Sequence, residues 1–407
     1  MISLPSSRAL ICSLVLLSAS TEGRAIEPAD SPRPVKVGVL VSLSGSWSSL
    51  GRNTVAALRV AADDLKNESP YRYHFLVRDT KLEPARALEA IKALHRSGVQ
   101  IVIGPQSSSE VAMIKPFADA HKMLVISQGS TASSLAISGD NVFRLCPNDT
   151  REAPAVVALM QQDGIRAIVP IWRNDAGNNG LHDSVEKVFE AAGGTVAQGY
   201  RYETSTTDFS AAASDVSQQI DALVTGGMAP SEIAVYCAAF DEVVDLFHSA
   251  QSLPTLAGTA WYGSDGVALS AALVGDAPAA AFAADAGYPN PIFGLKDSLA
   301  SKWRPVSKAI RKRTGLMPDA FALSAYDALF VADSALEKTG GVHHFSKFKA
   351  AFLRESRHFS GVTGSTALDA AGDRRSSNFD FWAVRSVNGS YDWVRTGTYH
   401  DGLLTVF

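Results

Sequence analysis

The sequence predicts an α/β protein of two doubly wound, parallel-sheet lobes joined by a hinge that the chain crosses more than once. Its 407 residues exceed the length of one typical domain. Short apolar runs alternate with helical patterns in units of about 30 residues, as in parallel strands joined by right-handed crossovers. The alternation pauses once and then restarts, so we expect one such sheet in each lobe.

Composition excludes several other classes of protein. Hydrophobic residues form 46% of the chain, and 37 Lys and Arg are balanced by 41 Asp and Glu, a composition that does not fit a disordered chain. A net charge of −4 offers no basic surface for a phosphate backbone. We therefore expect no nucleic-acid partner.

The N-terminal segment is typical of a secretory signal peptide. Arg8 precedes an apolar run, residues 9–19, that is too short to span a bilayer, and small residues follow at Ser20 and Ala25. We assign the signal to residues 1–25 and expect a secreted, periplasmic protein.

The three cysteines predict no disulfide framework. Cys12 lies in the signal segment, and Ile11 precedes it where lipid attachment favours a small residue, so a lipid anchor is disfavoured. Cys146 and Cys237 end apolar, strand-like runs. A small buried hydrophobe is the common occupant of such a position, and we expect two free, buried thiols.

Two series of elements follow from the periodicity of apolar residues. In the first series, the predicted strands are 35–41, 73–77, 99–103 and 123–126, and the predicted helices are 54–66, 84–96 and 111–120. In the second, the strands are 165–171, 195–200, 233–236 and 256–262, and the helices are 153–162, 181–192, 209–223 and 241–250. The segment 145–150 separates them; it contains Pro147, and Thr150 is expected to cap the next helix.

The last third of the chain changes character. The predicted helices are 298–313, which Pro305 should kink or split, 321–338 and 345–354. Residues 379–395 predict a hairpin that turns at Asn388-Gly389. Because an isolated hairpin is only marginally stable, the hairpin and these helices should pack on the lobes. We assign 35–147 and 285–360 to the N-terminal lobe and 148–284 and 361–407 to the C-terminal lobe.

Motifs for catalysis are missing from the sequence. It contains no phosphate-binding loop, dinucleotide fingerprint, nucleophile elbow, zinc-protease helix or CxxC pair. His343 and His344 have no second ligand pair at helical spacing. We expect no enzyme, no cofactor and no metal site.

Small polar residues follow two strands of the first series. Ser108 lies just after the strand at 99–103, and Gly129 and Thr131 lie just after the strand at 123–126. Ligands bind at the carboxyl ends of strands in open α/β sheets, and free amides at helix starts favour an anion. Simple helix capping is the commoner use of such residues. Two such loops, with the loop that contains Trp47, favour a small ligand bearing a carboxylate.

Loops of the second series offer complementary groups. Asp265, in a Gly-bounded loop after a strand, could receive an ammonium group or cap its own turn. Asp175 and Asn178 lie between a strand and a helix, and Phe240 opens a helix. These groups meet the first loops only if the lobes face each other.

Several segments of the chain resemble, in their order and spacing, segments of the type I periplasmic solute-binding proteins of the leucine/isoleucine/valine kind. Those proteins serve branched-chain amino acid ABC transporters. The segments that carry the resemblance are Val37–Gly45, Ile101–Pro105, Val125–Ser127, Tyr262–Asp265 and Phe321–Ala328. It extends from about Val35 to the end of the chain.

The resemblance implies two lobes that close on a small-molecule ligand and deliver it to the membrane subunits of an ABC importer, and we expect a monomer. It places Ser108, Gly129 and Thr131 on a ligand carboxylate. It places Asp265 on the α-amino group and Phe240 over the ligand.

Two departures leave the side chain of the ligand open. Gly177 and Asn178 stand where branched-chain binders usually have an aromatic residue, and the first loop has Trp47 with Leu50 at the expected place. We therefore predict an amino acid or amino-acid-like ligand. A sensor of the same fold, acting on a separate membrane signalling partner, is the alternative.

Overall fold

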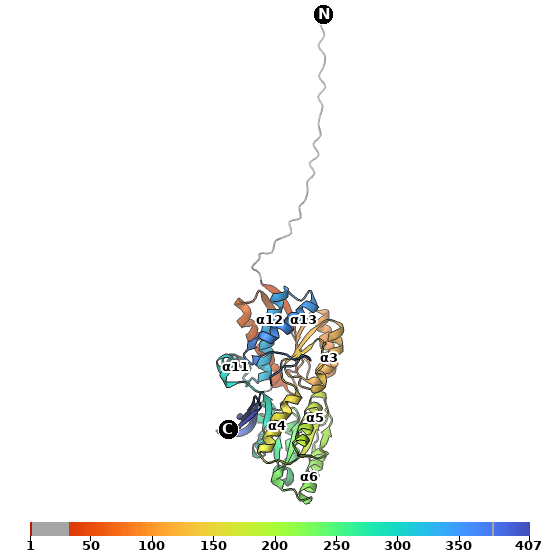
Figure 1. The fold of residues 1–407 in the computed structure, drawn as a ribbon, viewed down its shortest axis with the longest axis vertical. Coiled ribbons are helices and arrows are strands. Elements are labelled where there is room, and N and C mark those ends of the chain that lie inside the picture. Colours follow the sequence, from red (N-terminus) through yellow and green to blue (C-terminus); the bar gives the residue numbers. More distant parts are fainter. Residues whose placement is uncertain (2–31, 377) are drawn as a thin grey trace.

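The computed structural model describes Met1, residues 32–376 and residues 378–407, which form two lobes stacked along the long axis of the molecule (Figure 1). Apart from Met1, the predicted signal segment at residues 1–25 lies outside the described residues, and so does Cys12. No helix in the described ranges is long and apolar enough to cross a membrane.

The first lobe is built on a parallel sheet with the strand order β2-β1-β3-β4-β5. Its strands are β1 (Arg33–Val41), β2 (Tyr71–Asp79), β3 (Ile101–Ile103), β4 (Leu124–Ser127) and β5 (Val142–Arg144). The helices α2 (Pro84–Arg96) and α3 (Ser108–Ala120) cover one face. The other face is covered by α1 (Ser48–Asp64), α11 (Ala300–Thr314), α12 (Ala320–Thr339) and α13 (Phe345–His358).

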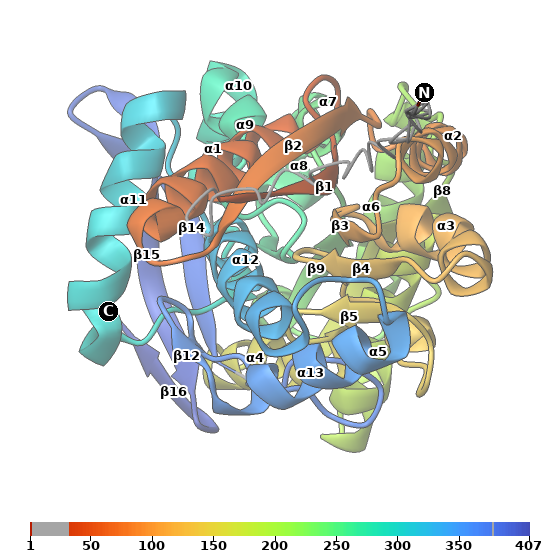
Figure 2. The same cartoon turned by 90° about the horizontal axis from the view of Figure 1, so that it is seen from above.

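Burial on both faces explains the continuous apolar runs of this sheet. Along β1, Val37 and Val39 point into the core beneath α1 and α12, whereas Leu40 points into the core beneath α2 and α3. Helix α12 belongs to this lobe although it lies far along the chain, and it packs beside α1 (Figure 2).

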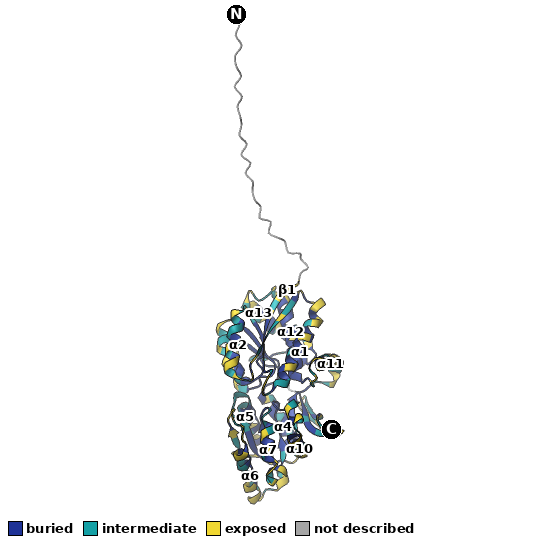
Figure 3. Ribbon diagram, turned by 180° about the vertical axis from the view of Figure 1, so that it is seen from behind, coloured by how far each residue is buried: buried dark blue, intermediate teal, exposed yellow. Residues whose placement is uncertain are grey.

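The second lobe repeats the plan with the order β10-β9-β6-β7, and β8 also pairs with β6. Its strands are β6 (Ala167–Arg173), β7 (Thr195–Val196), β8 (Tyr200–Tyr202), β9 (Ile233–Ala238) and β10 (Ala260–Tyr262). The helices α4 (Asp149–Gln162) and α5 (Ala176–Ala191) cover one face. The opposite face is covered by α6 (Ser210–Thr225), α7 (Val243–Ala250) and α10 (Ala277–Asp285). Figure 3 shows the buried strands between partly exposed helices.

A third sheet, antiparallel, was not predicted. Its order is β11-β14-β15-β16, and its strands are β11 (Asn290–Phe293), β14 (Phe379–Val387), β15 (Ser390–His400) and β16 (Leu403–Val406). The predicted hairpin turn is confirmed, since Asn388 and Gly389 have φ of 51° and 83°. The sheet lies at the side of the junction between the lobes, near α11 and α4 (Figure 1).

The chain passes between the lobes in three segments: between β5 and α4, between β11 and α11, and between α13 and β14. The last segment contains a two-stranded ladder of β12 (Ser360–Gly361) and β13 (Gly364–Ser365). Because β11 pairs with β14, we propose that the second crossover follows Phe293 and does not precede residue 285.

Several local predictions need correction. The strand expected at 256–262 begins later than predicted. Pro254 starts the short helix α8 (Pro254–Ala257) as an N1 residue, and only β10 is extended. The strand expected at 195–200 is divided into β7 and β8, with Gly199 at φ 68° between them.

Two further predictions concern a helix start and a helix break. Thr150 lies inside the first turn of α4, and Asn148 occupies the N-cap position. Pro305 lies inside α11, and the helix continues through it, so the expected split does not occur.

The two remaining cysteines are free and buried, as the sequence predicted. Burial raises the pKa of the Cys237 thiol to about 12 and also raises that of Cys146. Both thiols are therefore neutral at physiological pH and act as small apolar side chains.

Candidate ligand-binding site

Ser108 lies in the first turn of α3, but it does not cap that helix. Ser107 is the N-cap, and its Oγ accepts a hydrogen bond from the Glu110 amide at 3.4 Å. The Oγ of Ser108 instead accepts hydrogen bonds from the Ser130 hydroxyl and the Ala132 amide, both at 3.1 Å. The two loops that the sequence singled out in this lobe are thus in direct contact.

Gly129 and Thr131 lie in the loop after β4, and both are buried. A Cβ atom on Gly129 would lie 3.0 Å from the Gln106 carbonyl oxygen and 3.3 Å from the Trp47 ring, so a side chain has little room there. The carbonyl of Thr131 accepts a hydrogen bond from the Asp149 amide at 2.9 Å. This bond joins the first lobe to the start of α4.

Trp47 and Phe240 bring the two lobes together. Their ring centroids are 4.9 Å apart, and both side chains are buried. The Trp47 amide donates to Asp241 Oδ2 at 2.7 Å, and the Asp241 amide donates to Ser46 Oγ at 3.3 Å. The loops of the two lobes therefore face each other, which is the condition on which the predicted site depended.

Asp175 holds its own loop together. Its Oδ1 accepts from the Asn178 amide at 3.0 Å, and its Oδ2 accepts from Arg173 Nε at 2.8 Å and Asn178 Nδ2 at 3.1 Å. Both carboxylate oxygens of Asp175 are thus used inside the loop. The Oδ1 of Asn178 is buried and has no hydrogen-bond partner in the described part of the chain.

Asp265 lies beside two buried carboxylates that the sequence analysis missed, Asp149 and Glu152. We call these three residues the acidic cluster. The Asp265 amide donates to Glu152 Oε1 at 3.3 Å. Among the described residues, Asp265 Oδ2 and both carboxylate oxygens of Asp149 accept no hydrogen bond of normal geometry, although the Thr131 hydroxyl and the Ser133 amide lie near Asp149.

Burial is the main cause of the perturbed acidities in the acidic cluster. It raises the pKa of Asp149 to about 7, and the nearby Thr131 hydroxyl and Arg144 guanidinium offset only part of this effect. Burial, followed by repulsion from neighbouring carboxylates, raises the pKa values of Glu152 and Asp265. At neutral pH the cluster therefore holds protons that exposed carboxylic acids would have released.

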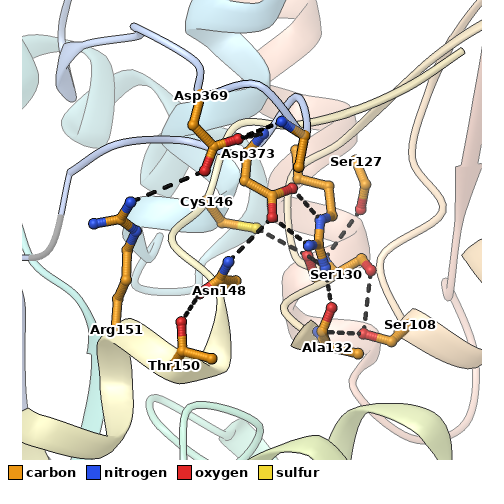
Figure 4. Close-up of polar contacts among 12 residues, drawn as sticks. Ser108, Ser127, Ser130, Ala132, Cys146, Asn148, Thr150, Arg151, Asp369 and Asp373 are labelled. Carbon is orange, nitrogen blue, oxygen red and sulfur yellow. Dashed lines mark hydrogen bonds and ion pairs between the residues drawn. The ribbon is translucent and has the colours of Figure 1, made fainter. Parts of the chain in front are cut away.

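A buried ion pair holds the loop at 130–132 in place; Figure 4 shows its acid, Asp373, near Ser130 and Ala132. Arg144 donates through Nε and Nη2 to the two oxygens of Asp373, at 2.6 and 2.5 Å. Its Nη1 also donates to the carbonyl of Ala132 at 2.6 Å, and Asn148 Nδ2 donates to Asp373 at 3.1 Å. The pair fixes the ligand loop to the third crossover segment.

Sequence reasoning had little signal for the missed residues. Asp149 and Glu152 have i, i+3 spacing, which places them on one face of α4, but acids in a first turn are also what the helix dipole favours. Only the approach of Asp265 from the second sheet makes them a cluster.

Two curated relatives match most of this chain. An uncharacterized protein of Methanocaldococcus jannaschii is 27% identical over 372 residues, which are 86% of this chain and 87% of the relative. The Leu/Ile/Val-binding protein BraC3 of Rhizobium johnstonii is 23% identical over 361 residues, or 86% of this chain and 91% of the relative.

Solved structures share the fold. A substrate-binding protein of a branched-chain amino acid transporter from Streptococcus pneumoniae, in complex with isoleucine, has a TM-score of 0.72 and 19% identity over 89% of this chain and all of that one. A solute-binding protein of an ABC transporter from R. palustris, in complex with benzoate, has a TM-score of 0.73 and 18% identity over 89% of this chain and 96% of that one.

These named neighbours are solute-binding proteins and not enzymes, as the sequence predicted for this chain. The two-lobe fold also agrees with the resemblance to type I periplasmic binding proteins. The model of the family described as the receptor family ligand binding region matches residues 53–386, and this chain belongs to that family.

Proposed function

We propose that this protein is an extracytoplasmic solute-binding protein that captures an amino acid or amino-acid-like molecule between its lobes and delivers it to an ABC importer. One observation carries the proposal. Ser108, Thr131 and Asp265 are all buried, and the Asp149 amide, on the helix that Asp265 contacts, donates to the Thr131 carbonyl of the first lobe. Such a set can bind a carboxylate and an ammonium group together.

Each predicted residue has a role in this proposal. Ser108, Gly129 and Thr131 bind the ligand carboxylate through hydroxyl and amide groups, and Asp265 accepts from the α-ammonium group. Phe240 covers the ligand and packs on Trp47. The contacts from both lobes stabilise the closed state over the open one, which is the whole mechanism of capture.

The side-chain pocket involves the loop before α5. We propose that Asn178, whose Oδ1 is unpartnered in the described structure, contacts the ligand. Asp175 positions Asn178 through two hydrogen bonds, so its effect on binding is indirect.

The carboxylate of Asp265 favours ligands with an amino group over ligands without one. The neighbour of the same fold that holds benzoate has a ligand without an amino group. The neighbour that holds isoleucine has a ligand with one. A buried carboxylate at the interface is unfavourable beside an uncharged ring and favourable beside an ammonium group, which supports the amino-acid class.

Thermal unfolding tests the ligand class. The mature chain, refolded to remove any carried ligand, is heated with amino acids, amides and aromatic acids in turn. A ligand at 100 times its dissociation constant adds about 2.7 kcal/mol to stability. We expect amino acids or their analogues to raise Tm; a response to aromatic acids alone would exclude the role of Asp265.

Calorimetry on variants tests the residues. Asp265→Asn should weaken binding of an α-amino ligand by about 1.5 to 3 kcal/mol, and Ser108→Ala by about 0.5 to 1.5 kcal/mol. Asp183→Asn is the control, because Asp183 is exposed on α5. Unchanged affinity in Asp265→Asn would remove this residue from the site.

Uptake of labelled ligand tests delivery to an importer. Cells that lack this chain should lose high-affinity uptake of the ligand. Intact uptake would instead favour the sensor, which reports the ligand to a membrane partner without moving it.

A further inference from the structure

The acidic cluster is balanced only in part by a positive side chain, the Arg144 guanidinium near Asp149. Within the described ranges, no Lys, Arg or His forms an ion pair with Asp149, Glu152 or Asp265. The nearby cations have other partners. Arg144 pairs with Asp373, Arg151 lies 4.0 Å from Asp369, and the buried Arg374 donates to the Leu145 carbonyl and the Thr363 hydroxyl. Burial makes the ionised carboxylates costly, so the empty cluster keeps protons, and a cation supplied from outside can bind in place of those protons.

Uncharged polar groups at the cluster also lack partners. Tyr236 is 1% exposed, and its hydroxyl forms no hydrogen bond in the part of the chain that the structure describes. Burial, and then the charges of Glu152, Asp265 and Asp149, raise the pKa of this phenol, so the three acids are close enough to act on it. The Oγ of Ser264, next to Asp265, is also buried and unpartnered among the described residues. These oxygens can accept hydrogen bonds that a ligand donates.

The spacing of the acids favours an organic cation over a metal ion. Among the described residues, the one group of three ligand atoms that lie within 4.8 Å of each other is that of His182, Asp183 and Glu186, on α5. The acidic cluster does not meet that spacing. Two separate cationic groups on one molecule can reach carboxylates that a single ion cannot bridge.

We propose that the ligand carries a second cationic group, an ammonium or guanidinium, which binds Glu152 and Asp149 while Asp265 binds the α-ammonium. This inference rests on the proposed capture of an amino-acid-like ligand at the lobe interface. A single ammonium would leave the other two acids protonated and without a charged contact to the ligand. A basic amino acid, or a diamine with the same spacing, supplies the charge that the cluster lacks.

Matched probes on the unaltered mature protein test this proposal by calorimetry. Ornithine is compared with norvaline, and arginine with citrulline, because each pair differs in the distal cation and little else. We expect the cationic member of at least one pair to bind about 10- to 100-fold more tightly, the range of a charged hydrogen bond. Putrescine and agmatine test whether the carboxylate is needed.

A variant assigns the preference to a residue. Glu152→Gln should lower the affinity for the cationic probe about 10-fold or more and leave that for its neutral counterpart unchanged. Glu190→Gln is the control, since Glu190 is exposed on α5. The comparison of probes on the unaltered protein decides the proposal even if Glu152→Gln does not fold.

The outcomes separate this inference from the proposed function. If neutral amino acids bind as tightly as their cationic counterparts, the second cationic group is excluded while capture of amino acids stands. If diamines bind as tightly as ornithine, the second cationic group is supported and the carboxylate contact fails. If no amino acid or amine binds, both proposals are overturned.

Discussion

Two groups of buried charges lie a few residues apart in this protein and differ in how they are satisfied. Arg144 and Asp373 are each 1% exposed or less at the side chain and form a two-bond ion pair, with Asn148 and two backbone carbonyls completing it. The acidic cluster is equally buried, and two of its members, Asp149 and Asp265, have unpartnered oxygens among the described residues. A buried charge with partners is compensated within the folded protein, whereas a buried charge without partners needs a proton or a ligand.

This difference predicts opposite responses to mutation. Removing a partner from the Arg144 network leaves a buried charge without its counter-ion and destabilises the free protein. Removing a charge from the acidic cluster relieves repulsion and desolvation in the free protein. The following measurements test that contrast, from the largest expected effect to the smallest.

The largest effect should come from Asp373→Ala. Arg144 would stay buried without its counter-ion, and the free energy of unfolding should fall by about 3 to 5 kcal/mol, measured by urea denaturation. Asp63→Ala is the control, because Asp63 pairs with Arg313 at the surface with its side chain 67% exposed. The control should change stability by about 1 kcal/mol or less. An equal loss in both variants would contradict the contrast.

A pH-dependent gain is expected for Asp149→Asn. The folded-state pKa of Asp149 is about 7, above its unfolded value. The folded protein therefore keeps a proton that the unfolded chain releases, and this residue destabilises the fold increasingly as pH rises from about 4 to 7. Asparagine cannot ionise and escapes this cost.

The measurement is urea denaturation of Asp149→Asn and the parent at pH 5 and pH 7.5. The stability of the variant relative to the parent should be higher at pH 7.5 by on the order of 2 kcal/mol. Any constant effect of the buried amide cancels between the two pH values. A relative stability that does not change with pH would show that Asp149 ionises normally.

The smallest effects come from two buried tyrosines. The Tyr262 hydroxyl donates to Asp163 Oδ2 at 2.6 Å, so Tyr262→Phe should lose about 1 kcal/mol of stability. Tyr236→Phe removes a hydroxyl that has no partner in the described structure and should leave stability unchanged or slightly raised. Thermal unfolding of the free protein compares them. A clear loss in Tyr236→Phe would mean that its hydroxyl has a partner in the folded protein.

Much of the fold was predictable because its signals are local. Strands covered on both faces give continuous apolar runs, and helix faces give the i, i+3, i+4 pattern, so the predicted helix at 84–96 has the same bounds as α2. The third sheet was not predictable in this way. The strand β11 has four residues, and it pairs with β14, which lies far along the chain.

The candidate site likewise has parts that local sequence signals predict and parts that they do not. The sequence by itself determined the loops with Ser108, Thr131 and Asp265, because small polar residues after buried strands are visible in a single stretch of chain. Only the tertiary structure decided that Glu152 and Asp265, 113 residues apart, lie in contact and lack a counter-charge. Burial and charge balance depend on every segment packed around a group, and no local pattern of residues records them.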